Sequence, residues 1–333
     1  MLKILQMPAN YVFIFFESFI LSVLLITLLK KVTLNKNLFY SKGMPIFGGM
    51  AIGLSFIIVV LFNFKNNIFS GDLNGILISG IIMLAFGVID DLREFSIISK
   101  FLAHLAVTSF LILFGIRTHI INIGHVPNII ITIVWVIGIT NAFNHLDVMD
   151  GLAGGVALII SFSFFIISVL NQDIKNAILS LSLTGGISAF LIYNLPPANI
   201  YMGNSGSHFL GFILSVIAIN ISYAPLERKI ALFSPLLIMG LPLFDTAFLI
   251  VMRISKKILP FMKSNDHMAL KFLTLGYSKK KSLYVMLFLC LFFSLCGILI
   301  SQVSNFLGVV IITLASLVSL IISFRFSKVP ING

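Results

Sequence analysis

Long apolar runs make up most of this chain, and short polar segments separate them. A run of about 17 to 23 residues is long enough to cross the hydrocarbon core of a bilayer as a helix. Such runs begin near residues 11, 44, 74, 97, 127, 152, 176, 205, 230, 282 and 306. The pattern predicts an all-α, polytopic integral membrane protein with about eleven transmembrane helices in a single domain, residues 1–333.

Composition excludes a soluble globular fold, because 59% of the residues are hydrophobic and only 10% are charged. The segment 11–29 lacks the small-residue cleavage site of a signal peptide, so we expect it to be a retained first span. Cys290 and Cys296 are interpreted as packing residues rather than a disulfide or zinc site. The two halves of the chain show no internal repeat, which weakens a transporter interpretation.

Basic residues set the predicted orientation through the positive-inside rule. With the N-terminus outside and the C-terminus in the cytoplasm, the cytoplasmic segments hold 16 of the 22 Lys and Arg residues. The same rule accounts for the net charge of +11 without a nucleic-acid partner. We therefore expect a multi-pass protein of the cytoplasmic (inner) membrane.

One stretch, NAFNHLDVMDGLAGG at residues 141–155, places polar side chains where burial in a membrane does not require them. Asn141, Asn144, Asp147 and Asp150 recur every third residue, so on one helix each would lie beside the next. Their oxygens suit a cation or a cation-bridged phosphate. The alternative is a polar helix end capped by Asn and Asp, although one such side chain is enough for a cap.

Four further stretches at the predicted cytoplasmic ends carry polar residues. Asp90 and Asp91 are adjacent carboxylates, which are tolerated best beside a cation or a proton. The glycine-rich segment from Gly203 to Ser207 begins a predicted span, where free N–H groups favour anions. By itself this segment is better explained by Ser205 or Ser207 as an ordinary N-cap. The other candidates are Lys42, which could instead snorkel to lipid headgroups, the intramembrane Asp245, and His267 in a basic loop.

These groups together suit phosphoryl transfer at a membrane surface. Carboxylates can hold Mg²⁺ and orient an attacking oxygen, while N–H groups and cations bind phosphate oxygens. His104, His119, His125 and His208 are interpreted as packing or interface residues.

The five stretches, in this order, resemble the polyprenyl-phosphate N-acetylhexosamine-1-phosphate transferases of glycosyltransferase family 4. This family includes undecaprenyl-phosphate GlcNAc-1-phosphate transferases and the phospho-MurNAc-pentapeptide translocase. The resemblance covers residues 42–278, and the segment PLFDT is more similar to the GlcNAc-1-phosphate branch.

The resemblance implies a reaction in which a UDP-N-acetylhexosamine and polyprenyl phosphate give polyprenyl-diphospho-sugar and UMP, with Mg²⁺, for cell-wall or surface-polysaccharide synthesis. It implies that Asp90 and Asp91 are catalytic and that Asn144 and Asn204 face the metal. A homodimer is compatible with it. The substrate-binding residues that it implies are Lys42, Asn141, Asp147, Asp150, Gly203, Ser205, Gly206 and His267.

Three motifs depart from the family pattern. Asn204 stands where an aspartate is expected, Val148 replaces a glycine, and Ala269 and Leu270 stand where a histidine cluster is expected after His267. An amide oxygen can bind Mg²⁺ but brings no charge. An active transferase, a catalytically impaired paralogue that binds lipid phosphate or nucleotide sugar, and a transporter are the three hypotheses.

Overall fold

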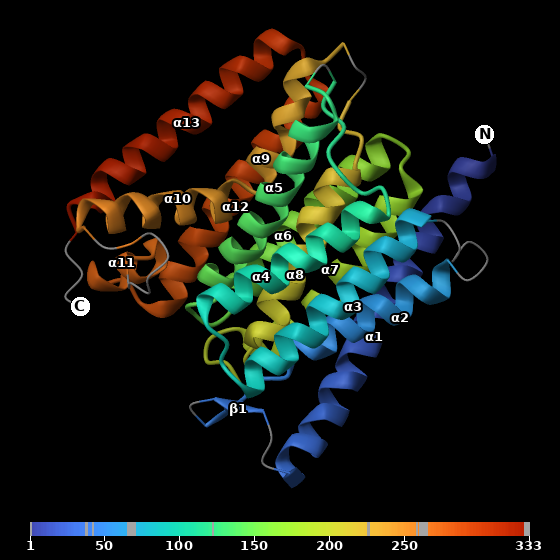
Figure 1. Ribbon diagram of the computed structural model, residues 1–333, viewed down its shortest axis with the longest axis vertical. Coiled ribbons are helices and arrows are strands. Elements are labelled where there is room, and N and C mark those ends of the chain that lie inside the picture. Colours follow the sequence, from blue (N-terminus) through green and yellow to red (C-terminus); the bar gives the residue numbers. More distant parts are fainter. Residues whose placement is uncertain are drawn as a thin grey trace.

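The computed structural model describes residues 2–36, 39–41, 43–64, 71–121, 123–224, 227–257, 259 and 266–329 (Figure 1). Within these residues the chain is helical apart from one short hairpin, which confirms the all-α prediction at that level. The hairpin pairs β1 (Tyr40–Ser41) with β2 (Met44–Pro45) in antiparallel fashion. The helices are α1 (Leu2–Lys36), α2 (Gly48–Asn63), α3 (Gly71–Leu92), α4 (Ile97–Leu113), α5 (His125–Leu146), α6 (Leu152–Leu170), α7 (Ile174–Asn194), α8 (Gly203–Asn220), the 3₁₀ helix η1 (Lys229–Phe233), α9 (Ser234–Ile238), α10 (Gly240–Ser255), α11 (Met268–Thr274), α12 (Lys279–Gln302) and α13 (Asn305–Ser327).

Each predicted span corresponds to a helix, but the helices are not all long enough to cross a bilayer. Among the described residues, seven helices are long and apolar enough to do so, or eight if the bent pair described below is one span. Helices α2 and α4 have only 16 and 17 residues. A polytopic membrane protein is therefore confirmed, whereas the count of eleven and the orientation remain predictions.

The ninth predicted span is not one straight helix. Its two parts, Lys229–Ile238 and Gly240–Ser255, are bent by 71° relative to each other. Pro242 lies in the first turn after the break, and proline has no N–H group with which to continue the preceding helix. The bend directs α10 across the bundle rather than along α9 (Figure 1).

Helix α8 lies at the centre of the bundle. It packs against α2, α3, α5, α6 and α7, and its side chains are buried on all sides from Ser205 to Ala218. Such a helix needs apolar residues around its whole circumference, which the run FLGFILSVIA supplies. The N-terminus of α8 is thereby fixed relative to the ends of α2, α3 and α5.

Small residues bring these helix ends close together. A Cβ atom at Gly49 would lie 2.0 Å from the backbone nitrogen of Gly206, so α2 and α8 can approach this closely only through glycine. The start of α2 also donates to the segment before α8, since the N–H groups of Gly48 and Gly49 bond the carbonyls of Tyr201 and Met202 at 3.1 and 2.8 Å.

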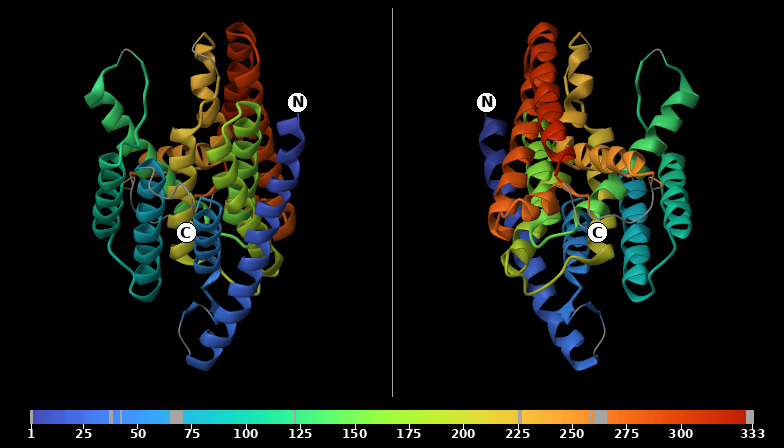
Figure 2. Two further views of the ribbon diagram at one scale, coloured as in Figure 1. Left: turned by 90° about the vertical axis from the view of Figure 1, so that its right-hand side faces the viewer. Right: turned by 90° about the vertical axis from the view of Figure 1, so that its left-hand side faces the viewer.

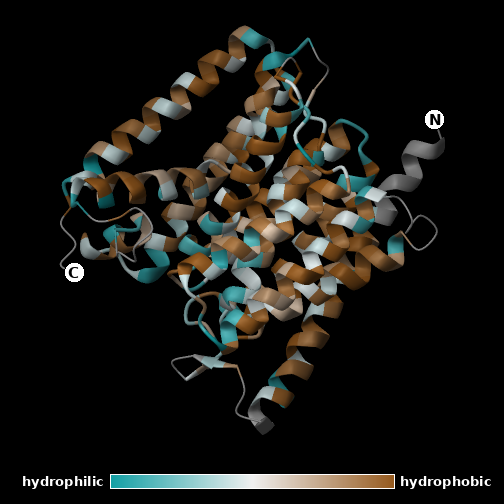
Figure 3. Cartoon of the chain, in the orientation of Figure 1, coloured by the Kyte–Doolittle hydropathy of each residue, from teal (hydrophilic) through white to brown (hydrophobic). Residues whose placement is uncertain are grey.

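The periphery is apolar and exposed, as expected for helices that face lipid. Helix α13 runs along one edge of the molecule (Figure 1) and buries only Gly308, Ala315 and Phe326. Figure 2 shows it beside α12, and Figure 3 shows that most of its surface is hydrophobic. Hydrophilic residues gather mostly at helix ends and in the connecting segments.

Candidate active site

Asp91 joins the end of α3 to the beginning of α8. The backbone N–H groups of Asn204 and Ser205 donate to its two carboxylate oxygens at 2.6 and 3.0 Å. Gly203 has a φ of +77°, and a Cβ atom there would lie 2.7 Å from Asp91 Oδ2. The expectation of free N–H groups at this helix start is therefore wrong for Asn204 and Ser205, because the partial positive charge of the helix N-terminus is already matched by a carboxylate.

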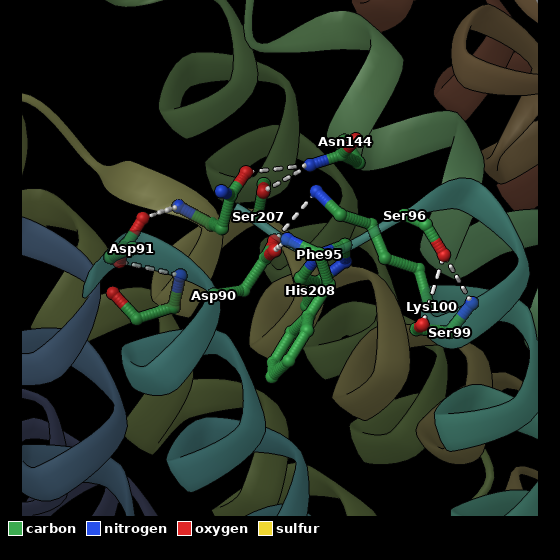
Figure 4. A network of polar contacts seen from close by, with 11 residues as sticks. Asp90, Asp91, Phe95, Ser96, Ser99, Lys100, Asn144, Ser207 and His208 are labelled. Atoms are coloured by element: carbon green, nitrogen blue, oxygen red, sulfur yellow. Dashed lines mark hydrogen bonds and ion pairs between the residues drawn. The ribbon is translucent and has the colours of Figure 1, made fainter. Parts of the chain in front are cut away.

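Asp90 points to the other side of α3 and is buried, with 2% of its surface exposed. Lys100 Nζ lies 2.7 Å from its Oδ2, and His208 Nε2 lies 3.4 Å from the same oxygen (Figure 4). The N–H group of Phe95 donates to Oδ1 at 2.8 Å. A buried carboxylate requires such partners, and these three come from the connection between α3 and α4, from α4 and from α8.

Asn144 connects the last full turn of α5 to α8. Its Nδ2 donates to Asn204 Oδ1 at 3.2 Å and to Ser207 Oγ at 3.1 Å (Figure 4). These bonds occupy the amide nitrogen of Asn144, so its carbonyl oxygen remains available to a ligand. The predicted neighbours Asn144 and Asn204 therefore meet, although sixty residues separate them.

The polar stretch at residues 141–155 is not one helix. Helix α5 ends at Leu146, and Asp147 and Asp150 lie in a turn that closes at Gly151 with a φ of +76°. The row of four side chains along a helix is therefore a wrong prediction, because α5 ends before both acids, and the left-handed Gly151 lies directly before α6. Asn141 remains on α5, where its amide donates to the Ile137 carbonyl of the same helix at 2.9 Å.

The turn at residues 147–151 packs against the segment between α7 and α8. Asn194 accepts from the Gly151 N–H at 2.9 Å and donates to the Ile200 carbonyl at 2.8 Å. Asp150 accepts weakly from the Ala198 N–H at 3.4 Å. The stretches that contain Asp150 and Asn204 are thus held near each other by hydrogen bonds between side chains and backbone.

Asp147 lies within the electrostatic influence of two other carboxylates. Its side chain has a solvent-exposed surface, but the surrounding protein also desolvates it. This desolvation is the largest cause that raises its pKa to about 7, and the negative charges of Asp91 and Asp150 contribute less. Neighbouring carboxylates disfavour the ionisation of all of them at once, whereas a bound cation favours it.

A second polar group lies where α5, α10 and α11 meet. Asp245 of α10 accepts from His267 Nδ1 at 3.2 Å and from the Met268 N–H at 2.9 Å. The imidazole rings of His145 and His267 have centroids 6.2 Å apart. Asp245, which the sequence marked as an intramembrane acid, therefore holds His267 in place.

The structure brings most of the predicted site residues to one end of the bundle. Those at or beside the groups described above are Asp90, Asp91, Asn144, Asp147, Asp150, Gly203, Asn204, Ser205, Gly206 and His267. Gly206 is buried against α2. Lys42 lies outside the described residues.

Three residues near these groups were not predicted as site residues. Lys100 is a lone cation at the start of an apolar segment, and this could have marked it. His208 was interpreted as a packing residue, although it contacts Asp90. His145 stood in the conspicuous polar stretch without an assigned role, because its partner His267 lies 122 positions later in the sequence.

The segment that carries most of this arrangement is similar to a known family. A model of glycosyl transferase family 4 matches residues 73–222, which include Asp90, Asp91, Asn144 and Asn204. The resemblance predicted from the motifs is thereby confirmed. His267 lies outside the matched segment.

Proteins similar to this chain over most of its length have related names. A Bacillus subtilis protein named a probable undecaprenyl-phosphate N-acetylglucosaminyl 1-phosphate transferase is 29% identical over 82% of this chain and 78% of the relative. An undecaprenyl-phosphate alpha-N-acetylglucosaminyl 1-phosphate transferase of Thermotoga maritima is 28% identical over 78% of each chain. A decaprenyl-phosphate N-acetylglucosaminephosphotransferase of Mycobacterium leprae is 27% identical over 71% of this chain and 68% of its own length.

Proposed function

We propose that this protein transfers an N-acetylhexosamine-1-phosphate from a UDP-sugar to polyprenyl phosphate, for cell-wall or surface-polysaccharide synthesis. A phosphate oxygen of the lipid attacks the β-phosphorus of the donor. The bond from that phosphorus to the oxygen bridging it to UMP breaks, so polyprenyl-diphospho-sugar forms and UMP leaves. The names of the relatives support the acceptor class and the sugar phosphate.

The observation that carries the proposal is the meeting of Asp90, Asp91, Asn144 and Asn204 at one end of a membrane bundle. They come from the ends of α3 and α5 and the beginning of α8, and Lys100 lies beside them. The Lys100 side chain is 18% exposed, so its ammonium can meet an incoming lipid phosphate while it neutralises Asp90. An acceptor in the membrane and a soluble donor can both reach such a place.

The oxygen-rich side of the site fits Mg²⁺. Within the described residues, no three His, Cys, Asp or Glu side chains converge to hold a metal by themselves. Mg²⁺ does not require this, since it commonly keeps waters and substrate phosphate oxygens beside one or two protein ligands. Asn144 and Asn204 would hold the ion, with Asp147 and Asp150 supplying negative charge nearby. When bound, the ion supplies charge neutralisation for the donor diphosphate.

The basic segments support a cytoplasmic position for this end of the bundle, in the inner membrane, with eleven membrane-crossing or partly crossing segments. The cytoplasm is the compartment in which a UDP-sugar is available. The proposal also includes a homodimer, with which the family resemblance is compatible.

The test uses membranes that contain the protein, incubated with radiolabelled UDP-GlcNAc, undecaprenyl phosphate and Mg²⁺. We expect labelled lipid and UMP, and we expect EDTA or Asp91→Asn to abolish both. Asp72→Asn is a matched control, because Asp72 lies at the opposite end of the same helix and pairs with Lys175. Absence of labelled lipid across several UDP-sugars would contradict the proposal.

Asn204 favours a second candidate, a paralogue that binds lipid phosphate or nucleotide sugar without turnover. Its amide is paired with that of Asn144, an arrangement that adds no charge to the site. Binding of UDP-GlcNAc with no product at any Mg²⁺ concentration would support this candidate over the transferase.

A further inference from the structure

His145 lies at the site, but the proposed reaction assigns it no role. It lies in the last turn of α5, directly after Asn144, and its side chain is partly exposed. Neither ring nitrogen is bonded to any of the described residues, and neither is sealed from solvent, in contrast to both ring nitrogens of His104. Both nitrogens can therefore contact a ligand.

The neighbouring imidazole has one nitrogen committed. Asp245 Oδ2 accepts from His267 Nδ1, which fixes the orientation of the ring and leaves Nε2 to face other partners. The second oxygen of Asp245 accepts from the Met268 N–H, so this acid is fully occupied in holding His267. Two imidazoles, one in the last turn of α5 and one directly before α11, thus lie with ring centroids 6.2 Å apart.

A cation beside this imidazole pair favours an anion there. Arg253 of α10 is buried, and its charge acts on His145 together with that of Asp245, the acid that His267 already pairs with. On the other side of the same helix turn, Asn144 contacts Asn204. Successive residues of a helix point about 100° apart, so the end of α5 presents an amide to α8 and an imidazole to α10 and α11.

We infer that His145 and His267 together bind the diphosphate of the nucleotide-sugar donor, with His145 supplying an imidazole that the shortened histidine motif lacks. Ala269 and Leu270 occupy the two positions of that motif at which histidines are expected, and Ala269 is buried at 1% exposure. The inference rests on the proposed function, because it names the donor of that reaction. The diphosphate would extend from the pair Asn144 and Asn204 to the two imidazoles.

The first test measures UDP and UDP-GlcNAc binding to the full chain in nanodiscs by calorimetry, together with steady-state kinetics. We expect His145→Leu to raise the Kd for UDP and the KM for UDP-GlcNAc about tenfold, because one charge-assisted hydrogen bond is lost. The kcat and the KM for undecaprenyl phosphate should stay within about twofold of the wild-type values. His145→Gln keeps an N–H donor and should recover part of the affinity. His119→Leu removes an exposed histidine from the connection between α4 and α5 and should change nothing.

A double variant separates a shared contact from general damage. If both rings hold one diphosphate, the effects of His145→Leu and His267→Leu should be non-additive on the Kd for UDP. Additive effects, or an unchanged Kd and KM in His145→Leu, would overturn the inference while leaving the transferase proposal in place. A wild-type protein that neither binds UDP nor makes labelled lipid would overturn both.

Chemical modification tests the wild-type chain directly, in case His145→Leu does not fold. Diethylpyrocarbonate should modify His145, and UDP should protect it while leaving His119 reactive, as read by mass spectrometry of the peptides. Equal modification of His145 with and without UDP would contradict the assignment.

Discussion

Asp90 and Asp91 are adjacent in sequence, yet their carboxylates have different partners. Asp91 caps the beginning of α8, whereas Asp90 is buried against Lys100 and His208. Successive residues of a helix point in different directions, so α3 can reach two neighbours from one turn. A substitution at either position therefore alters the packing of the site as well as its charge.

At the same scale, His208 is expected to position Asp90. His208→Leu removes a bond to a buried carboxylate and should lower kcat about tenfold, in line with roughly 1.5 kcal/mol for a charged partner. His104→Leu is the matched control, because both His104 ring nitrogens are buried and bond none of the described residues, so their removal should preserve or raise the melting temperature. Equal kcat in the wild type and His208→Leu would count against the positioning role.

Asn204 tests the charge of the proposed metal site. Asn204→Asp keeps an acceptor for Asn144 and adds a charge, so the half-saturating Mg²⁺ concentration should fall by about tenfold, or about 1.4 kcal/mol. Asn141→Asp adds the same charge to a side chain that bonds its own helix and should have a smaller effect. A rate assay across a Mg²⁺ titration provides the measurement, and an unchanged Mg²⁺ dependence would argue against Asn204 as a ligand.

At the scale of elements, the approach of α2, α3 and α8 determines where the acids lie. A Cβ atom at Gly87 would lie 2.5 Å from Ser205 Cα, just as one at Gly49 would meet Gly206. Close backbone contact between helices in a membrane depends on small residues of this kind. The site therefore exists only while these helices remain in contact at their ends.

Gly49→Ala should destabilise the protein by about 3 kcal/mol, the upper end of the usual cost of overpacking, because the new atom would meet backbone rather than a movable side chain. Gly138→Ala in α5 is the control: nothing lies within 4 Å of its added Cβ atom, and helix propensity favours alanine. Thermal unfolding in detergent should thus show a lower melting temperature for the first variant and an unchanged or higher one for the second. Equal melting temperatures would indicate that α2 and α8 can separate without cost.

At the scale of the whole molecule, α13 is held mainly near its two ends. Near its start the Ile230 N–H donates to Asn305 Oδ1 at 3.1 Å. Near its end the buried Lys271 donates to the carbonyls of Phe326 and Val329 at 2.9 and 3.1 Å. A cation at a helix C-terminus is favourable, and here it ties α13 to α11, the helix that follows His267.

Lys271→Met should release the end of α13 while leaving the bundle intact. Limited proteolysis should then cleave the C-terminal segment at least several-fold faster than in the wild type, because the carbonyls of Phe326 and Val329 lose the donor that Lys271 supplies. Lys328→Met removes an exposed lysine at the same end and should not change the cleavage rate. Equal protection of all three proteins would show that the Lys271 bonds do not hold this helix.

The sequence by itself determined the membrane class, the approximate position of most helices and the family resemblance, because apolar runs and short polar motifs are local features. It also located the stretches from which Asp90, Asn144 and Asn204 come. Tertiary structure alone decided that Asp91 caps α8, that the predicted ninth span bends by 71°, and that α5 ends before Asp147. It also decided the pairs Asp90 with Lys100 and His145 with His267. The physical reason is that these contacts depend on which helix ends meet, and that is set by the packing of α8 and its glycine neighbours rather than by spacing along the chain.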